Sequence, residues 1–321
     1  MRTTLKDVAR EAGVSVTLIS KFLNNNPNGR MSPATREKIE ETLRRLNYRP
    51  SELARSLKRG RSGTLGLVIS NLGNPHFGMF ADMILREAKK AGYQLLISLC
   101  DFGREEELEC LNSLLNRQVD GILYAEHLFD SPLIDRLGVE GFPLVADTFS
   151  GSFSCATFQM RKAYEDALNF LADSGARRIV LSYNIYGHVD ESLREFRCGV
   201  TVEPISVMSD LDERKELFRR ICREAPDAVI LPGGLSTLVF FKILKKEFPA
   251  YSPMLISCTN AGHQIPRVPG LLGFIRRDYR KKAEAMVRLV CDRINGKTTE
   301  RVEIPAEFIT INQTGEEDEL F

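Results

Sequence analysis

Apolar residues recur every three or four positions through the first part of the chain, in short segments separated by polar turns. The first segment, 4–12, opens with Thr4 and Asp7, which together resemble a capping box with the shorter acid in the second position. Gly13 follows where the chain must turn sharply, a position that favours φ > 0. Ser15 is placed to cap the next helix. The pattern therefore predicts a helix-turn-helix.

A third helix is predicted from Ser32 and Pro33, a cap followed by proline at the first helical position. A polar loop, 24–30, joins it to the second helix. Residues 51–60 then spell a helix of only about two turns, and helices that short are marginal in water without tertiary partners. We expect this segment to be a hinge that is disordered until something supports it.

From Gly63 onward the period changes, and apolar β-rich runs alternate with amphipathic segments. This alternation predicts an α/β fold in which parallel sheets carry helices on both faces. Two such units in tandem leave a ligand cleft outside the carboxyl ends of their strands. The predicted strands are 64–70, 93–100, 120–125, 143–147, 178–182, 228–232 and 253–258. The predicted helices include 77–91, 104–117, 163–174, 212–224 and 238–248.

Charge is unevenly distributed along the chain. The whole sequence has a formal net charge of only +1, from 44 basic and 43 acidic residues. Residues 1–62 hold 14 basic and 6 acidic residues, a net of +8, whereas the remaining 259 residues hold 30 basic and 37 acidic, a net of −7. A small positive module suits a phosphate backbone, because neutralising phosphates releases counterions.

Length and composition exclude several classes of protein. A chain of 321 residues exceeds what one core usually organises, and no apolar run approaches the roughly 20 residues that span a bilayer. The first residues lack the apolar core of a secretory signal, so we expect a cytoplasmic protein. The seven cysteines are scattered without a Cys-x-x-Cys pair, and the four histidines have no metal-ligand spacing. We expect reduced thiols, with a redox-sensing cysteine as the lesser alternative, and neither a metal nor a cofactor.

Glycine-rich motifs of enzymes are incomplete in this sequence. Gly60, Gly63 and Gly66 lie between a predicted helix and a strand, whereas a dinucleotide site needs its glycines after a strand. Gly233 and Gly234 follow a strand, yet no Walker lysine follows them. No Gly-x-Ser-x-Gly elbow is present. We assign no catalytic residue and do not expect an enzyme.

Residues 1–50, which contain the three predicted helices, are called the headpiece below. With this headpiece, the chain resembles the LacI/GalR (lactose/galactose repressor) family of bacterial transcription regulators. The matching runs are 4–9, 12–15, 32–39, 46–50 and 54–57, followed by 66–68, 74–77, 91–93 and 120–123. The resemblance covers the whole chain and is strong to about residue 125. It implies a periplasmic-binding-protein-like core of two doubly wound subdomains and a homodimer. That dimer would bind a near-palindromic operator, and an effector between the subdomains would alter its DNA affinity.

The resemblance also gives roles to the headpiece residues. Val16, Thr17 and Lys21 face outward on the second helix, where the family reads bases; Lys21 suits guanine and Val16 a thymine methyl. Leu57 lies where family members insert a side chain into the minor groove, although it can also be read as an apolar contact on a short helix. The other candidate DNA contacts are Thr4, Ser15, Asn24 and Ser32 on phosphates, with Ala54 and Lys58 in the hinge.

The family's usual ligand contacts are largely replaced. Gln159 lies where family members have an Asp-Asn pair, and Gly233 lies where they have an Asn-Asp pair. Ser192 replaces an arginine that commonly binds a sugar or purine in the family. These changes remove polar groups that would hydrogen-bond sugar hydroxyls. Either the effector differs from a common sugar, or the core binds an effector weakly or not at all. The candidate effector contacts are His76, Phe77, His127, Asp147, Gln159, Ser192, Arg194, Gly233 and Asn260. For His76, Phe77, His127 and Asp147, ordinary strand-end packing is an equally supported interpretation.

Four regions are expected: a headpiece (1–50), a hinge (51–62), a core for effector binding and dimerisation (63–315) and an acidic tail (316–321). The expected function is a DNA-binding transcription regulator, a repressor in kind, under the control of a small molecule such as a carbohydrate derivative. The alternative is a DNA-binding regulator whose degenerate core serves only dimerisation. A sugar-transport protein or an α/β enzyme fits neither the headpiece nor the lack of an export sequence.

Overall fold

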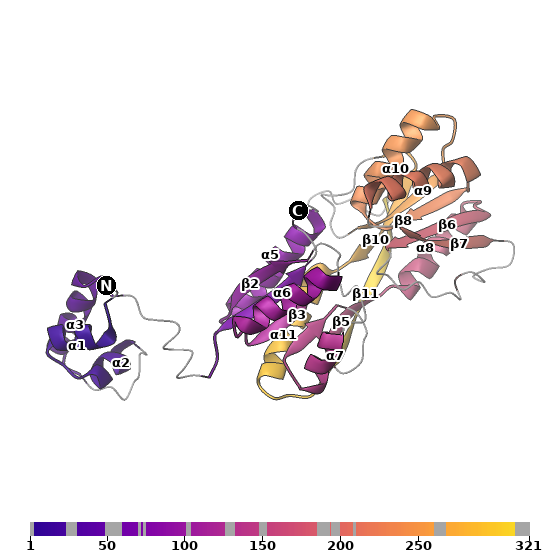
Figure 1. The fold of residues 1–321 in the computed structure, drawn as a ribbon. Helices are drawn as coiled ribbons and strands as arrows, with labels where there is room; N and C mark the ends of the chain where they lie inside the picture. The colour runs from indigo at the N-terminus through magenta and orange to yellow at the C-terminus, as the bar shows by residue number, and fades with distance from the viewer. Residues whose placement is uncertain are drawn as a thin grey trace. The chain divides into compact units, whose positions relative to one another are not determined.

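The computed structural model describes residues 3–23, 31–48, 60–69, 72, 75–100, 104–125, 132–147, 153–184, 193, 200–207, 210–259 and 268–311. They form two compact units, Met1–Ser62 and Gly63–Phe321 (Figure 1). Within the described ranges, no helix is long and apolar enough to cross a membrane. The predicted loop 24–30, hinge residues 51–59 and the acidic tail lie outside these ranges.

The first unit contains the three helices that the sequence predicts. They are α1 (Leu5–Ala12), α2 (Val16–Leu23) and α3 (Pro33–Arg45). Both hydrogen bonds of the capping box are present, because the Asp7 amide donates to the Thr4 hydroxyl and the Thr4 amide donates to the Asp7 carboxylate. Gly13 ends α1 with φ of 66°, the left-handed conformation that glycine adopts without strain. The capping box and the glycine turn are thus confirmed.

A small apolar core holds these three helices together. Its buried members are Val8, Ala9, Ala12, Ile19 and Ile39. Phe22 and Leu43, which the apolar pattern also directs inward, pack against this core while remaining partly accessible. Each helix therefore contributes one apolar face and leaves its opposite face to solvent.

The second unit is built on one continuous sheet of 11 strands among the described residues, in the order β2-β1-β3-β4-β5-β11-β10-β9-β8-β6-β7 (Figure 1). The strands are β1 (Thr64–Ile69), β2 (Gln94–Leu99), β3 (Gly121–Tyr124), β4 (Leu144–Ala146), β5 (Ser154–Gln159), β6 (Arg178–Asn184), β7 (Thr201–Val207), β8 (Ala228–Leu231), β9 (Met254–Thr259), β10 (Leu271–Arg277) and β11 (Arg301–Thr310). The helices are α5 (Pro75–Lys90), α6 (Arg104–Asn116), α7 (Pro132–Val139), α8 (Arg161–Asp173), α9 (Leu211–Glu224), α10 (Gly234–Glu247) and α11 (Tyr279–Ile294).

Strand β11 joins the two halves of this sheet. Its residues 301–305 pair in parallel with β5, whereas residues 306–310 pair antiparallel with β10. The prediction of two parallel α/β halves is confirmed, with this one antiparallel pair as a departure. The reason is geometric: the carboxyl ends of β5 and β10 face each other across the middle of β11, so one strand can be parallel to only one of them.

Helices cover both faces of each half. In the first half, α5 and α11 share one apolar cluster with the sheet, and α6 and α7 share another. In the second half, α8 lies in one cluster and α9 with α10 in the other. Gly121 of β3 shows how closely α11 is seated, because a Cβ there would lie 2.5 Å from Cγ2 of Val290. This layering is what the alternating sequence pattern predicts.

Helix α10 begins four residues earlier than the sequence predicts, at Gly234 rather than Leu238. The first turn is polar in sequence but buried, since Ser236 and Thr237 are nearly inaccessible. The Thr237 hydroxyl donates to the Gly233 carbonyl at 2.9 Å and lies 2.7 Å from the hydroxyl of Ser257 on β9. These hydrogen bonds satisfy polar groups in a position that apolar periodicity cannot reveal.

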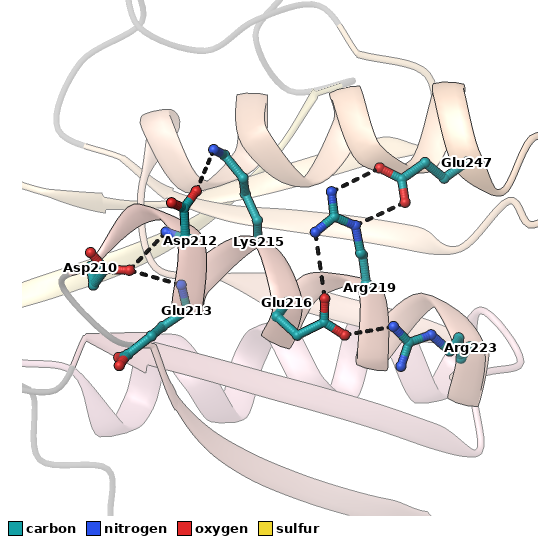
Figure 2. A network of polar contacts seen from close by, with 8 residues as sticks. All are labelled: Asp210, Asp212, Glu213, Lys215, Glu216, Arg219, Arg223 and Glu247. Carbon is teal, nitrogen blue, oxygen red and sulfur yellow. Dashed lines mark hydrogen bonds and ion pairs between the residues drawn. The ribbon is translucent and has the colours of Figure 1, made fainter.

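An ion-pair network ties the outer surfaces of α9 and α10 together (Figure 2). The Arg219 guanidinium makes a bidentate contact with Glu247 at 2.9 and 3.1 Å, and Glu216 joins Arg219 to Arg223. The hydrogen bond from Arg223 is the main reason that the pKa of Glu216 is lowered. Arg219 is half-buried and the other groups are exposed, so solvent screens their attraction and the network is a modest structural link between helices.

Candidate nucleic-acid interface and ligand-binding residues

The outer face of α2 presents the side chains that the sequence assigns to base contact. Val16, Thr17 and Lys21 are exposed, whereas Ile19 on the opposite face is fully buried. The Ser15 hydroxyl accepts a hydrogen bond from the Leu18 amide at 3.1 Å, which fixes the start of the helix. The arrangement leaves α2 with a rigid outer surface carrying a cation, a hydroxyl and an apolar branch.

Ser20 lies on that same outer face and was not selected from the sequence. It stands four residues after Val16 and three after Thr17, so the helix brings all three side chains to one side. Its side chain is half-buried. Helical spacing alone is the signal that would have included it.

The basic residues of the first unit differ in whether an acidic side chain pairs with them. Arg10 pairs with Asp7 at 2.9 Å and Arg45 with Glu11 at 2.7 Å. Three exposed lysines make no ion pair with any described residue: Lys6, Lys21 and Lys38. Ammonium groups without acidic partners in the fold are available to phosphate oxygens.

Of the other headpiece candidates, Thr4 and Ser32 are exposed helix caps. The Ser32 hydroxyl accepts from the Thr35 amide at 3.2 Å. Four candidate DNA contacts fall outside the described residues: Asn24, Ala54, Leu57 and Lys58. The same holds for four candidate effector contacts: His127, Ser192, Arg194 and Asn260.

The remaining effector candidates all lie at the carboxyl ends of strands or just after them. Asp147 follows β4, exposed Gln159 ends β5, and Gly233 precedes α10 after β8. His76 is in the first turn of α5, and Phe77 beside it is buried in the apolar core of the first half. This is the edge of the sheet where open α/β folds place their ligands.

A cluster of aromatic and cationic side chains gathers around His76. The His76 ring lies edge-on to Tyr279 at 4.5 Å, and Tyr279 also contacts Phe158 at 4.8 Å, each measured between ring centroids. The ammonium of Lys282 lies 4.8 Å from the Phe158 ring centroid and 3.3 Å from the Asp147 carboxylate. We call this set the strand-end cluster: His76, Phe80, Asp147, Phe158, Arg277, Tyr279 and Lys282.

Sequence reasoning missed most of this cluster because it did not predict β10 or α11. Arg277 ends β10, and Tyr279 and Lys282 lie in the first turn of α11. Asp278 caps that helix by accepting from the Lys281 amide at 3.0 Å. An apolar β-rich run followed by a capping aspartate is the pattern that would have located them.

Acid should destabilise the second unit partly through His76. Burial, followed by the charges of Arg277 and Lys282, lowers the pKa of His76 to about 3. An unfolded histidine takes up its proton near pH 6.5, so between pH 6.5 and 3 the unfolded state binds a proton that the folded state does not. We expect the free energy of unfolding to fall by up to about 1.4 kcal/mol per pH unit from this group. Urea denaturation of the protein and of His76→Gln should show a shallower pH dependence in the variant; parallel curves would contradict the assignment.

Removing the Lys282 ammonium should take from the mostly buried Asp147 carboxylate the ion-pair partner that lies 3.3 Å away. The side chains are only 5% and 16% exposed. We expect Lys282→Met to cost about 3 kcal/mol, and the addition of Asp147→Asn to recover about half of that. Urea denaturation measures both. Lys281→Met, at an exposed neighbouring position, is the control and should change stability by less than about 0.5 kcal/mol. Strictly additive effects of the two substitutions would show that the pair is not coupled.

A protein-family model matches the first unit of the chain. Residues 4–51 match the family model described as "Bacterial regulatory proteins, lacI family". The match confirms the family resemblance of the headpiece, since it begins at the Thr4 cap and covers all three helices.

A longer sequence match extends into the second unit. The chain is 33% identical over 184 residues to catabolite control protein A of Staphylococcus epidermidis, which is 56% of this chain and 55% of the relative. A second relative, catabolite control protein A of Priestia megaterium, is 34% identical over 182 residues, covering 56% of this chain and 54% of the relative. The match thus spans about half the length of these curated relatives.

Solved structures share the fold along almost the whole chain. The lac repressor dimer bound to operator and the anti-inducer ONPF aligns with a TM-score of 0.78 at 19% identity, covering 98% of this chain and 99% of that one. The transcriptional regulator CelR in complex with cellobiose aligns with a TM-score of 0.65 at 21% identity, covering 96% and 98%. At this identity the likeness concerns the fold, and it confirms the predicted headpiece-plus-core architecture.

Proposed function

We propose that this chain is a transcription regulator of the lacI family, a repressor in kind, which binds a near-palindromic operator as a dimer. The observation that carries the proposal is the capped helix-turn-helix at residues 4–51, which matches that family's model and exposes Val16, Thr17 and Lys21 on one helix face. A helix with such a face enters the major groove in proteins of this kind. Three exposed lysines of the same unit, Lys6, Lys21 and Lys38, make no ion pair with any described residue and supply attraction to phosphate.

Roles follow for the individual headpiece residues. Lys21 donates to a guanine edge, Val16 meets a thymine methyl, and Thr17 hydrogen-bonds a base or its phosphate. Thr4, Ser15, Asn24 and Ser32 position the headpiece on phosphates, and Ala54, Leu57 and Lys58 form the hinge contacts in the minor groove. The boundaries proposed for the regions are 1–50, 51–62, 63–315 and 316–321; the division of the fold between Ser62 and Gly63 supports the second of them.

Exposed apolar side chains support self-association through the second unit. Leu85 of α5 is 44% exposed, and Ile97 and Leu99 lie exposed on β2, which is an edge strand of the sheet. Leu235 and Leu238 are exposed together on α10 in the other half. Large apolar groups gathered at an open strand edge favour contact with another copy. We propose that the operator-binding form is a homodimer held by these surfaces.

The core is proposed to sense a small molecule at the carboxyl edge of the sheet, where His76 and Asp147 of the strand-end cluster lie and where Gln159 ends β5. The alternative, a core that serves only dimerisation, is favoured by the loss of the family's usual arginine and amide contacts. The core is proposed to carry no catalytic activity and the protein to act in the cytoplasm, where operator DNA is found. A ligand that binds the core and changes operator affinity would support the sensing core; a core that serves only dimerisation should show no such effect.

A selection from randomised duplexes tests the proposal directly. We expect the full chain to enrich a near-palindromic site and to occupy it with two copies, because each headpiece reads one half-site. Mass photometry or analytical ultracentrifugation on the selected duplex gives the stoichiometry. Failure to enrich any sequence, or binding by a single copy, would contradict the proposed function.

Lys21→Ala should relax base preference at one position of each half-site. If the ammonium donates to guanine O6 and N7, the variant loses roughly 1–3 kcal/mol at that position only. Binding to a set of single-base operator variants measures this. Arg44→Ala removes the same charge from α3 and is the matched control, expected to leave the preference unchanged. Equal weakening on every sequence would mean that Lys21 contacts phosphate instead.

A further inference from the structure

Two cysteine side chains in the first half of the sheet point into the same apolar cluster. Cys100 directly follows β2, and Cys110 lies on the inward face of α6, which packs against β2. Both belong to the cluster that α6 and α7 share with the sheet, and they are only 5% and 9% exposed. Of the cysteines that the structure describes, no other two are members of one apolar cluster.

A hydrogen bond holds the Cys110 sulfur beside the backbone of Cys100. The Cys110 thiol donates to the Leu99 carbonyl oxygen, with 3.0 Å between sulfur and oxygen. In a trans peptide that oxygen lies roughly 2.8 Å from the next Cα, so the Cys110 sulfur is at most about 6 Å from the Cα of Cys100. Each sulfur in turn lies roughly 2.8 Å from its own Cα, so rotation of both side chains can bring the two sulfurs to bonding distance.

A buried carboxylate lies in the same surroundings as the two thiols. Glu107, one turn before Cys110 on α6, is 1% exposed, and its Oε1 accepts a hydrogen bond from the Tyr124 hydroxyl. Its other oxygen, Oε2, has no hydrogen-bond partner among the described residues. Burial, the hydrogen bond to Glu107 and then the charges of Glu107 and Cys100 raise the pKa of Tyr124, which places the Cys100 thiol near the same hydroxyl. The thiols thus share their apolar surroundings with an oxygen that is able to accept a proton.

We propose that Cys100 and Cys110 are a redox-active pair that a peroxide converts into an intramolecular disulfide, with Glu107 accepting the proton of the thiol that reacts first. The thiolate attacks one peroxide oxygen to give a sulfenic acid, and the other oxygen leaves as water after Glu107 returns the proton. The second sulfur then displaces the sulfenic hydroxyl, which leaves as water with the proton of the second thiol. Two thiols and one hydrogen peroxide thus give one disulfide and two waters, so that the sulfurs are oxidised and the peroxide oxygens are reduced.

The disulfide ties α6 to an outer strand of the sheet. Strand β2 has one neighbour in the sheet, β1, so its free edge is held by side-chain packing alone. Closing the short segment between residues 100 and 110 restricts the unfolded chain, and the oxidised second unit is therefore more stable than the reduced one. This redox chemistry goes beyond the proposed regulator function and does not depend on it.

Peptide mapping of the full chain tests the pair directly. Trypsin cuts after Arg104 and so separates the two cysteines onto the peptides 91–104 and 105–117, each with one cysteine. The protein is treated with hydrogen peroxide, and the remaining thiols are blocked with N-ethylmaleimide. We expect mass spectrometry to show the two peptides joined with the loss of two hydrogens, and two of the seven thiols to be consumed. Dithiothreitol should restore both thiols. The Tm of the oxidised second unit should be higher by about 3 °C or more.

Four variants assign the roles. Glu107→Gln keeps the size of the side chain and an oxygen for the Tyr124 hydroxyl, and it should slow disulfide formation at least about tenfold. Glu109→Gln, at an exposed position of the same helix, is its matched control and should leave the rate unchanged. Cys110→Ala should abolish the joined peptides and the rise in Tm. Cys222→Ala removes a buried thiol from the other half and should keep both.

The inference fails if both cysteines stay reduced in peroxide, or if the consumed thiols map to other cysteines or to bonds between chains. Joined peptides with an unchanged Tm would contradict the tie between α6 and β2. A Glu107→Gln protein that forms the disulfide at the original rate would remove Glu107 from the reaction. No DNA enters these measurements, so a failed operator selection would leave their outcome intact.

Discussion

Affinity for the selected operator is expected to fall by about 10³–10⁵ between 50 and 200 mM salt, if six to ten phosphates are contacted. The cause is counterion release by the first 62 residues, which carry a net charge of +8 and in which Lys6, Lys21 and Lys38 have no acidic partner among the described residues. The slope of log affinity against log salt concentration, measured by fluorescence anisotropy, counts the phosphates.

A charge variant sharpens that measurement. Lys6→Ala should lower the magnitude of the salt slope by about one if Lys6 contacts a phosphate, and it should do so on specific and random duplexes alike. Lys242→Ala removes one charge from α10 in the second unit and should leave the slope unchanged. A complex insensitive to salt would rule out the phosphate-dominated interface.

Ile39→Ala is expected to unfold the headpiece while the second unit stays intact. Ile39 is completely buried in a core that has four other buried apolar residues among those the structure describes. Truncating such a side chain costs about 2–5 kcal/mol, and a domain this small seldom has more than about 3–5 kcal/mol to lose. Operator binding should therefore disappear. Calorimetry or circular dichroism should show the loss of the headpiece transition, with the second unit's transition within about 2 °C of the original.

Two substitutions control for that experiment. Ile39→Val keeps most of the volume and should cost about 0.5–1.5 kcal/mol, enough to weaken DNA binding without abolishing it. Glu37→Ala alters an exposed position of the same helix and should retain binding. An Ile39→Ala protein that still binds the operator normally would show that the buried contacts of α3 do not hold α1 and α2 in place.

The headpiece was predictable because its signals are local. A cap, a glycine turn and helical periodicity each depend on residues within one or two turns, and the Thr4 capping box and Gly13 conformation agree with them. In the second unit, apolar strands such as β1 and β3 were predicted for the same reason. Strand β5 was not predicted. Ser154 and Thr157 interrupt the apolar run of β5, although both are buried in the sheet.

The missed elements show how tertiary structure overrides pattern. Strand β11 was not predicted because it contains Pro305 with Glu303 and Glu307 on either side, and proline and charged residues are unusual inside a strand. Lys282 conceals the inward face of α11, since a lysine breaks the apolar stripe that it in fact belongs to. The strand-end cluster depends on both elements. Its members meet only once β11 has joined β5 to β10, and no spacing in the sequence records that.

Strand β11, which pairs with both halves of the sheet, also affects when the second unit can complete its folding. Beside β11, the Glu300 amide donates to the Ser154 hydroxyl across 146 residues of sequence. Pairings that distant close large loops, and proteins rich in them fold slowly. Each half of the sheet lacks a neighbouring strand until residues 301–310 are present, so on a ribosome neither half is complete before those residues have been made. In hydrogen exchange, the amides along β11 should exchange together. Releasing this strand leaves β5 in one half of the sheet and β10 in the other without their shared neighbour at the same time.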